Sequence, residues 1–504
     1  MEELKAKRLA VKLKLVILAL LAFSFLGLIA GKIADVKSNG LTMETEQHWD
    51  TFGVGSTCVF GGHNLALADV DGDNLKEIIT GGVAYYVLPN GSRTKVSAPF
   101  KIWSWNGEDF KLKGSGNWTG YIRCVYAGDV DGDGSLEIVT SGGTFNGTSI
   151  YSSLQIWTFK NHTLTLEDEV KGITVHSTFI SDVNGDGQAE ILAVGGTLNG
   201  NQSISQLFIF KWDGEGLTLY TSKECFDKDS GQCSSVYAFD LNGDNTVEIV
   251  TAGYIGEIKN SSGHLAVWQL TGTQLSLKDK AEWQIVKGVY SVDVSGSPMG
   301  NTMASNLKVA DVDHDSIAEI VTCGFTYNGN KVQGQLRIWN YTGAKLSLEE
   351  SVEWTTLDIT HATSLSIADV DGDGKNEVVT SGYTAGYNSW APNAANKSRG
   401  ELKVWSWDGK NVTLEQSIDW IAGEAVSAWN VGAGDIDNDA IAEIVTVGCM
   451  QTGSLCDPDL RIWVVSIINE DSQTIPYLDI VVYSAAVIII ILLFVLVGKR
   501  KARK

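Results

Sequence analysis

One acidic segment recurs seven times along the 504 residues, and this repeat limits the possible folds more than any other feature. Each copy has Asp at positions one and five, Asp or Asn at position three, and Glu at position nine. Neighbouring copies begin between 53 residues (Asp129 to Asp182) and 71 residues (Asp240 to Asp311) apart. A period of this size indicates one supersecondary unit per repeat, with neighbouring units stacked into a continuous core.

Each repeat contains four strand-like runs separated by turn residues. The first run precedes the acidic segment, as in SLSIA before Asp369, and the second is the EIVT run inside it. The third carries an IW pair, as in LRIWNY from Leu336, and the fourth resembles LSLEESVEW from Leu346. Seven four-stranded antiparallel units predict an all-β chain that folds as a seven-bladed β-propeller over residues 41–467.

The N-terminal strand is expected to close this ring. LTMETEQHW, from Leu41 to Trp49, matches the fourth-strand pattern, whereas the seventh repeat ends after its IW run at Leu460. Pairing these two segments would complete the last blade and leave no open edge. The acidic turns and both ends of the propeller then lie on one face, and the opposite face points away from them.

Two apolar segments flank the predicted propeller. Residues 15–32 follow a basic segment, 1–14, and form either a cleaved signal peptide or a retained signal-anchor helix. Residues 480–498 follow a juxtamembrane linker, 468–479, and are long enough to span a bilayer before the basic tail 499–504. Since basic flanks favour the cytoplasmic side, both chain ends are predicted on the cytoplasmic side of the plasma membrane and the propeller on the extracellular side.

Charge and modification signals agree with an extracellular domain. The formal net charge of −22 argues against nucleic acid as a partner, because phosphate binding needs clustered Lys and Arg. Seven Cys residues suit an oxidising compartment, and two local disulfides are predicted, Cys225 with Cys233 and Cys449 with Cys456. Nine glycosylation sequons predict a glycoprotein: Asn90, Asn117, Asn146, Asn161, Asn201, Asn260, Asn340, Asn396 and Asn411.

The acidic segments are predicted to hold up to seven structural Ca²⁺ ions. Carboxylates at positions one, three, five and nine can surround a hard cation with oxygen ligands, and without a cation they would repel. The loops at Asp311 and Asp435 are expected to bind more weakly, because His314, Ser316, Asn438 and Ala440 replace the usual Gly or Asn. The predicted ligands are Asp69, Asp71, Asp73, Glu77, Asp129, Asp131, Asp133, Glu137, Asp182, Asn184, Asp186, Glu190, Asp240, Asn242, Asp244, Glu248, Asp311, Asp313, Asp315, Glu319, Asp369, Asp371, Asp373, Glu377, Asp435, Asp437, Asp439 and Glu443.

These segments resemble the FG-GAP/VCBS repeats, best known from the propellers of integrin α subunits. The resemblance covers about residues 41 to 466 and implies a seven-bladed propeller, Ca²⁺ in the loops and ligand binding on the face opposite the metals. Glu77 and its six equivalents stand where integrin-type loops usually have Asp, and Gly-containing runs such as Thr380-Ser381-Gly382 replace the GAP tripeptide. Integrin pairing and signalling are therefore not carried over.

Long loops on the face away from the metals are the predicted ligand-binding surface. Aromatic side chains on loops are common recognition anchors, although they can also pack the loops together. The candidates are Tyr85, Tyr86, Phe325, Tyr327, Tyr383, Tyr387 and Trp390. His63, Arg123 and His176 share one position, six residues before the first Asp of their repeats, and are either an anion or sugar pocket or ordinary strand-end residues.

The sequence favours a binding function over catalysis. No G-x-S-x-G or H-E-x-x-H motif occurs, and the IW tryptophans, such as Trp103, Trp157 and Trp405, are expected to pack between blades. The predicted function is a membrane-anchored, calcium-binding surface receptor or adhesion module for an extracellular protein or glycan, and not an enzyme. The alternatives are a polysaccharide-processing enzyme and a scaffold subunit of a membrane complex.

Overall fold

The structure is a computed structural model that describes most of residues 40–466. The described part excludes 48–54, 59–62, 88–92, 119, 146–149, 200–201, 227–229, 258–259, 286–290, 293–297, 300, 387–396 and 453–454. It contains β-strands and no α-helix, so the all-β prediction is confirmed. No helix among these residues is long and apolar enough to cross a membrane. The predicted segments 1–14, 15–32, 468–479, 480–498 and 499–504 lie outside the described residues.

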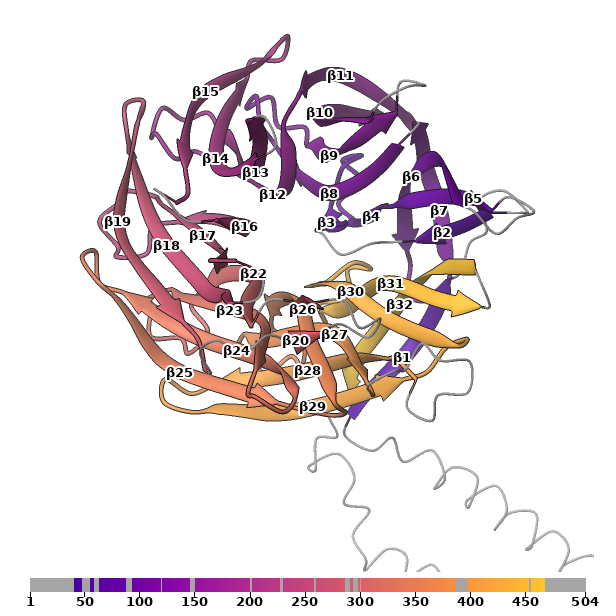
Figure 1. The fold of residues 1–504 in the computed structure, drawn as a ribbon. Coiled ribbons are helices and arrows are strands. Elements are labelled where there is room, and N and C mark those ends of the chain that lie inside the picture. Colours follow the sequence, from indigo (N-terminus) through magenta and orange to yellow (C-terminus); the bar gives the residue numbers. More distant parts are fainter. Residues whose placement is uncertain are drawn as a thin grey trace, which may run out of the picture. The chain divides into compact units, whose positions relative to one another are not determined.

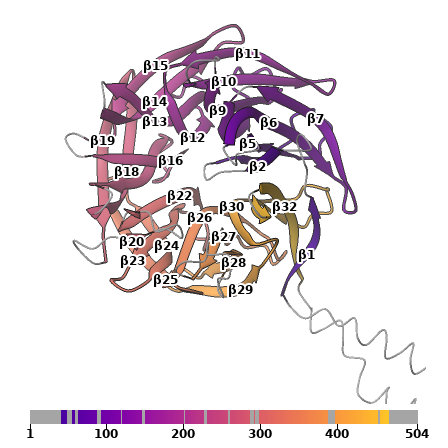
Figure 2. The same cartoon turned by 45° about the vertical axis from the view of Figure 1, so that its right-hand side comes forward.

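Residues Leu41–Val465 form one compact unit, whose sheets are arranged in a β-propeller-like ring around a central space (Figures 1 and 2). The second to fourth repeats each form one four-stranded antiparallel sheet in chain order. Their strands are β8 (Gly120–Gly128), β9 (Glu137–Phe145), β10 (Ile150–Lys160) and β11 (Thr163–Lys171); β12 (Thr174–Ser181), β13 (Glu190–Asn199), β14 (Gln202–Trp212) and β15 (Leu217–Glu224); and β16 (Gly231–Phe239), β17 (Glu248–Ile255), β18 (Ser262–Thr271) and β19 (Gln274–Trp283).

Two further quartets, the fifth and sixth repeats, are joined into one eight-stranded sheet by a single parallel residue pair, Val332 with Ile359. Their strands are β22 (Thr302–Ala310), β23 (Glu319–Tyr327), β24 (Val332–Tyr341), β25 (Leu346–Trp354), β26 (Ile359–Ala368), β27 (Glu377–Ala385), β28 (Arg399–Trp407) and β29 (Val412–Trp420). A two-stranded ribbon before them pairs β20 (Ser291–Val292) with β21 (Pro298–Met299).

The first repeat carries an extension of its sheet. Its quartet is β3 (Leu65–Ala68), β4 (Glu77–Gly81), β6 (Arg93–Trp105) and β7 (Phe110–Trp118). The long β6 continues beyond the quartet and pairs with β5 (Val83–Val87), which in turn pairs with β2 (Gly55–Cys58), so this sheet has six strands.

The last sheet joins the two ends of the ring. It consists of β30 (Ala425–Gly434), β31 (Glu443–Thr452), β32 (Leu455–Ser466) and, at its edge, the N-terminal strand β1 (Gly40–Gln47). The predicted pairing of the N-terminal segment with the final IW strand is thus confirmed for its described residues. Leu41 packs against the cluster that contains Trp463, and Arg461 Nη2 lies 3.1 Å from Glu46 Oε2. Strand hydrogen bonds, apolar contact and an ion pair together hold β1 in place.

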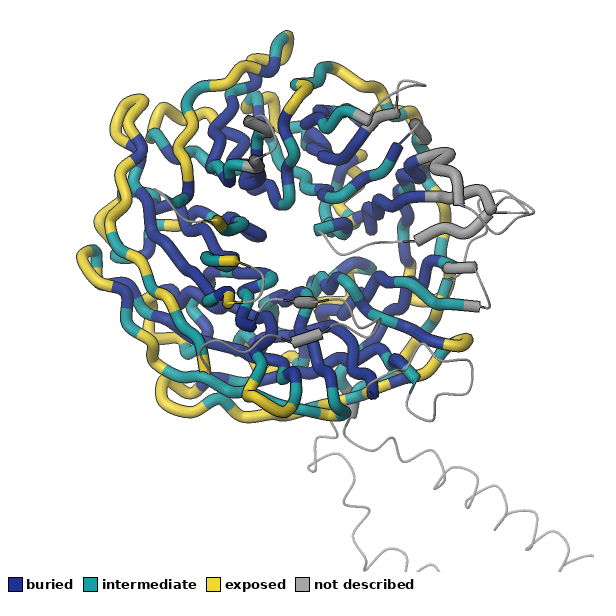
Figure 3. The backbone as a smooth tube through the Cα atoms, viewed as in Figure 1, coloured by how far each residue is buried: buried dark blue, intermediate teal, exposed yellow. Residues whose placement is uncertain are grey.

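The hydrophobic core is divided among the interfaces between consecutive repeats. Seven clusters among the described residues each combine side chains from two neighbouring repeats. One of them packs Trp103 and Trp105 of the first repeat against Val445 and Leu460 of the seventh, so apolar contact also continues across the junction of the ring. The second and third strands of each repeat are buried, whereas the outer, fourth strands such as β19 are largely exposed (Figure 3).

The IW tryptophans lie in these interfaces, as predicted. Trp405 packs against Val312, Val321 and Leu336 of the preceding repeat, and its indole Nε1 donates to Thr380 Oγ1 over 3.0 Å. The same Trp-to-Thr bond joins Trp157 to Thr140, Trp268 to Thr251, Trp339 to Thr322 and Trp463 to Thr446. A buried indole needs such a partner, so the pair of Trp and Thr recurs with the repeat.

Candidate functional site

The acidic segments form the turns between the first and second strands of each repeat, and one hydrogen-bond pattern shapes them. In the sixth repeat Asp369 accepts from the backbone N–H groups of Gly372 and Gly374 at 2.7 and 2.9 Å. Glu377 is 3% exposed and accepts from the Val370 N–H at 3.0 Å. This buried Glu bond is present in all seven turns, at Glu77, Glu137, Glu190, Glu248, Glu319, Glu377 and Glu443.

Carboxylate oxygens converge in five of the seven turns, where three of them lie within 4.8 Å of one another. The groups are Asp69, Asp71 and Glu77; Asp129, Asp131 and Glu137; Asp311, Asp313 and Asp315; Asp369, Asp371 and Glu377; and Asp435, Asp437 and Glu443. Burial, and then the neighbouring carboxylate of Asp371, raise the pKa of Glu377 to about 8. Crowded carboxylates of this kind suit a hard divalent cation with oxygen ligands, such as Ca²⁺.

A lysine ammonium enters the first turn. Lys113 Nζ, from β7, lies 2.7 Å from Asp71, 2.5 Å from Asp73 and 2.7 Å from Glu77. Burial acts to lower the pKa of Lys113, but the hydrogen bonds to these three carboxylates outweigh it and raise the pKa above its ordinary value. The ammonium therefore neutralises the carboxylates that were predicted to hold an ion, and it competes with a metal for that position.

The third and fourth turns also differ from the prediction. Lys211 Nζ, from β14, lies 2.5 Å from Asp186 and 3.1 Å from Glu190. Asn184 and Asn242, which were expected to supply ligand oxygens, direct their amide Nδ2 atoms to the buried Glu190 and Glu248. In these two turns an amide donates a hydrogen bond to the buried Glu, where a carboxylate at the same position would repel it.

The fifth and seventh turns keep their carboxylate groups although they lack the usual Gly and Asn residues. His314, Ser316, Asn438 and Ala440 all adopt left-handed backbone conformations, with φ between 65° and 73°. His314 Nε2 accepts from the N–H of Asn376, and Asn438 Nδ2 donates to the carbonyl of Asn74. These unusual side chains therefore connect one turn to the next around the ring.

The innermost strands carry a second repeated feature, a β-bulge six residues before the first Asp. The register of β26 against β27 skips Thr363, so Ala362 pairs with Gly382 and Ser364 with Ser381. A Cβ atom on Gly382 would lie 1.8 Å from the carbonyl oxygen of His361, so only Gly fits there. The same bulge occurs at Arg123, His176, Ser234, Ser305 and Trp429, opposite Gly142, Gly195, Gly253, Gly324 and Gly448.

These bulges place one residue from each of the second to seventh repeats at the mouth of the channel, the central space of the ring, and His63 has the equivalent position in the first repeat. A cavity of about 220 Å³ is lined by all seven residues at this position, namely His63, Arg123, His176, Ser234, Ser305, Thr363 and Trp429, together with Gln232, Met303, Phe325 and His361. Bulges commonly redirect a side chain next to a functional site. The predicted group of His63, Arg123 and His176 is therefore brought together at one cavity.

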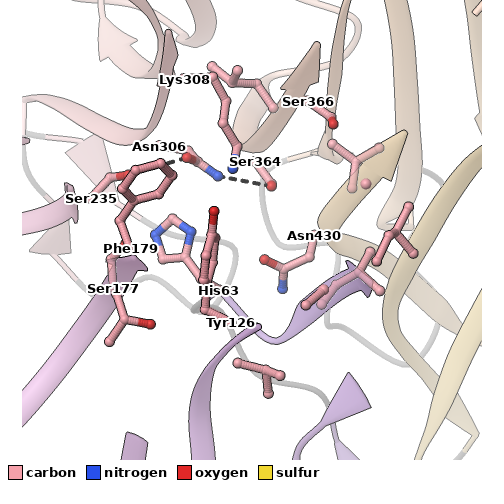
Figure 4. A pocket seen from close by; sticks show the side chains of 18 of the residues that line it. His63, Tyr126, Ser177, Phe179, Ser235, Asn306, Lys308, Ser364, Ser366 and Asn430 are labelled. Atoms are coloured by element: carbon pink, nitrogen blue, oxygen red, sulfur yellow. Dashed lines mark hydrogen bonds between the residues drawn. The ribbon is translucent and has the colours of Figure 1, made fainter. Parts of the chain in front are cut away.

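Below the mouth a second cavity of about 220 Å³ lies inside the ring, and His63 lines both (Figure 4). Its lining includes Lys308, whose side chain reaches into the channel, and a chain of small polar groups. Ser235 Oγ donates to Asn306 Oδ1 at 3.3 Å, and Asn306 Nδ2 donates to Ser364 Oγ at 3.0 Å. Burial lowers the pKa of Lys308. Burial also lowers the pKa of His63 to about 4, and the nearby charge of Lys308 acts in the same direction.

A sequence comparison assigns part of the chain to a repeat family. Residues 182–251, from the third acidic turn through the second strand of the fourth repeat, match the FG-GAP-like repeat. The chain therefore contains an FG-GAP-like repeat. No curated protein matches its sequence.

Two solved structures resemble this chain in outline. Rhamnogalacturonan lyase PL11 of Bacillus licheniformis is 14% identical, with a TM-score of 0.34, over 82% of this chain and 91% of the lyase. A putative 6-phosphogluconolactonase of Bacteroides fragilis is 10% identical, with a TM-score of 0.36, over 74% of this chain and 97% of the other.

The aromatic residues that were predicted to be exposed anchors are buried or partly buried wherever the structure describes their side chains. Phe325 and Tyr383 are 2% and 6% exposed, so the prediction of exposure is wrong for both. Both lie within strands, β23 and β27, and not on loops, and they stack against His361 with ring centroids 4.2 and 4.9 Å from its own. Tyr327 is partly buried beside them, and the side chains of Tyr85, Tyr86, Tyr387 and Trp390 lie outside the described set.

The cysteines agree with the sequence prediction only in part. Cys225 and Cys233 are buried free thiols, so the disulfide predicted between them is not formed in this structure. Both lie in the apolar interface between the third and fourth repeats, where a hydrogen bond with Cys233, followed by burial, raises the pKa of Cys225. Cys449 is disulfide-bonded, and the side chain of its predicted partner, Cys456, lies outside the described residues.

Proposed function

We propose that this protein is a membrane-anchored, extracellular binding module: a seven-bladed propeller, stabilised by Ca²⁺, that recognises a protein or glycan ligand. The strand quartets and the interfaces between consecutive repeats support the count of seven blades. The apolar segment 480–498, the basic residues after it and the nine sequons support an outward-facing, glycosylated ring.

One observation carries the binding function. The turns repeat the same hydrogen bonds seven times, yet the seven equivalent residues at the channel mouth are of five residue types and carry four different chemical groups. A uniform framework that presents different side chains toward one cavity is the arrangement expected of a recognition site. These groups are imidazoles, hydroxyls, one guanidinium and one indole, which can bind a ligand through hydrogen bonds, charge and stacking. We propose that the site binds its ligand without turnover.

We propose that Ca²⁺ ions occupy the turns and have a structural role. The five carboxylate groups support this assignment, and the charge repulsion that burial intensifies at Glu377 would be relieved by a bound cation. Lys113 and Lys211 make the first and third turns weaker metal sites than the sequence pattern suggests.

A binding screen tests this function. The full-length chain in detergent micelles would be applied to glycan and cell-surface protein arrays, with Ca²⁺ and with chelator. A ligand whose binding depends on the residues of the channel mouth supports the module. Turnover of a polysaccharide by the same preparation would overturn the proposal of binding alone and favour the polysaccharide-processing alternative.

A further inference from the structure

The channel is electropositive within an acidic protein. The chain has 60 Asp and Glu against 38 Lys and Arg, yet the described residues that line the two channel cavities include Arg123 and Lys308 and no carboxylate. Among the described residues, no acidic side chain lies within ion-pair distance of either cation. Burial lowers the pKa of both groups, so their charges are poorly solvated and would be stabilised by an incoming anion.

The mouth also contains buried polar groups that lack partners within the described part of the chain. They are His176 Nδ1, Ser234 Oγ and, deeper in the channel, Asn430 Nδ2. Burial lowers the pKa of His176 to about 3, so its imidazole is neutral at physiological pH and can both donate and accept. Unsatisfied buried groups are costly, and a ligand rich in hydroxyl groups would satisfy them.

One wall of the mouth is aromatic and well supported. Trp429 lies edge-on to Tyr383 with ring centroids 5.5 Å apart, and Tyr383 continues into the stack with His361 and Phe325. These ring contacts fix the position of the Trp429 side chain, which remains partly exposed and lines the cavity. A rigid indole face suits the apolar C–H face of a saturated ring such as a pyranose.

The cavity limits the size of the ligand. Its volume of about 220 Å³ is below the roughly 300–1,000 Å³ typical of pockets for drug-sized ligands. His63 crosses beneath it and donates from Nε2 to the carbonyl of Ser234 at 3.0 Å, which separates the mouth from the lower cavity. The mouth therefore accommodates one residue of a chain or one small molecule.

We propose that the channel mouth binds one sugar-acid residue, with its carboxylate on Arg123, its hydroxyl groups on the surrounding Ser, Thr and His side chains, and one ring face on Trp429. A guanidinium is the side chain best matched to a carboxylate, since it offers two parallel N–H donors. This inference rests on the proposed binding function and assigns a ligand class to it.

Calorimetric titration of the full-length protein with D-glucuronate and D-galacturonate tests the assignment, with glucose, succinate and inorganic phosphate as comparison ligands. We expect uronate binding, at least tenfold weaker binding of the three others, and at least a tenfold loss of uronate affinity in R123Q and in W429L. Arg399, which pairs with Asp419 at 2.8 Å on β28 and β29, provides the control R399Q, which should bind uronate as the wild type does.

Three results would overturn the assignment: no uronate binding, equal binding of glucose or succinate, or unchanged affinity in R123Q. Thermal unfolding of each variant shows whether it is folded, and R123K, which keeps the charge but loses the paired donors, replaces R123Q if that variant does not fold. A protein or glycan found by the array screen that binds R123Q normally would leave the module function intact while excluding this ligand site.

Discussion

His63 donates a hydrogen bond from Nε2 to the backbone carbonyl of Ser234, 3.0 Å away, although the two residues are 171 positions apart in the chain. A carbonyl oxygen can only accept, so the Nε2 atom of this imidazole carries the proton. The bond joins the first repeat to the fourth across the channel and divides the space inside the ring.

The burial of His63 predicts a pH dependence of stability. Burial, and then the charge of Lys308, lower the pKa of His63 from 6.5 to about 4 in the folded protein. Between these values the unfolded chain binds a proton that the folded protein does not, so stability is full above pH 6.5 and is lost as the pH falls toward 4. Denaturant titrations should show that the wild type loses on the order of 3 kcal/mol more than H63Q over this range.

The control for that comparison is the exposed His162, at the turn after β10. H162Q should keep the wild-type dependence, because His162 is exposed and takes no part in the bond between His63 and Ser234. Equal pH dependence of H63Q and the wild type would show that His63 does not carry the effect.

Lys113 is predicted to replace a metal ion in the first turn. K113M leaves Asp71, Asp73 and the buried Glu77 without their cation, so we expect a loss of about 3 kcal/mol of unfolding free energy in chelator. Millimolar Ca²⁺ should restore most of it, and the number of bound ions should rise by one. Lys278 is the matched control, since it occupies the equivalent position on β19 but donates to Gln269 instead, and K278M should change neither quantity.

Substitution of Gly382 by Ala is predicted to destabilise the protein more than substitution of Gly374, which lies in the same repeat. G382A would place Cβ 1.8 Å from the His361 carbonyl oxygen and disrupt the bulge at Thr363, with an expected loss of at least about 3 kcal/mol. Gly374 has φ near +87° but open space around it, so G374A should cost only about 1 kcal/mol. Chemical denaturation of both variants compares steric exclusion with backbone strain, and similar losses would contradict the bulge geometry.

Calcium removal is expected to destabilise the ring through turns such as that at Asp369. At a concentration one hundred times its dissociation constant, each ion contributes about 2.7 kcal/mol. D371A removes one ligand of the sixth turn, so equilibrium dialysis should find one ion fewer and Ca²⁺ should raise the melting temperature less. Asp213 caps an exposed turn between β14 and β15, and D213N should retain the wild-type ion count.

Local patterns in the sequence were sufficient to predict the strands, the acidic turns and the pairing of β1 with β32. Each of these depends on residues close together in the chain or on a repeat that the chain itself displays. The sequence also shows a glycine five residues after the Glu of each turn, such as Gly382. Why glycine is required there depends on the carbonyl of His361 on the neighbouring strand, which leaves no space for a Cβ atom.

The contents of the channel and of individual turns were decided only by tertiary structure. Lys113 reaches carboxylates 36 to 42 positions earlier in the chain, and His63 meets Ser234 across the ring, contacts for which no sequence spacing gives a signal. Phe325 and Tyr383 were predicted to be exposed on loops, yet they lie within β23 and β27, where they are buried against His361. Repeats determine the framework because strand pairing and burial act locally, whereas charge, ligand class and metal occupancy depend on which side chains the closed ring brings together.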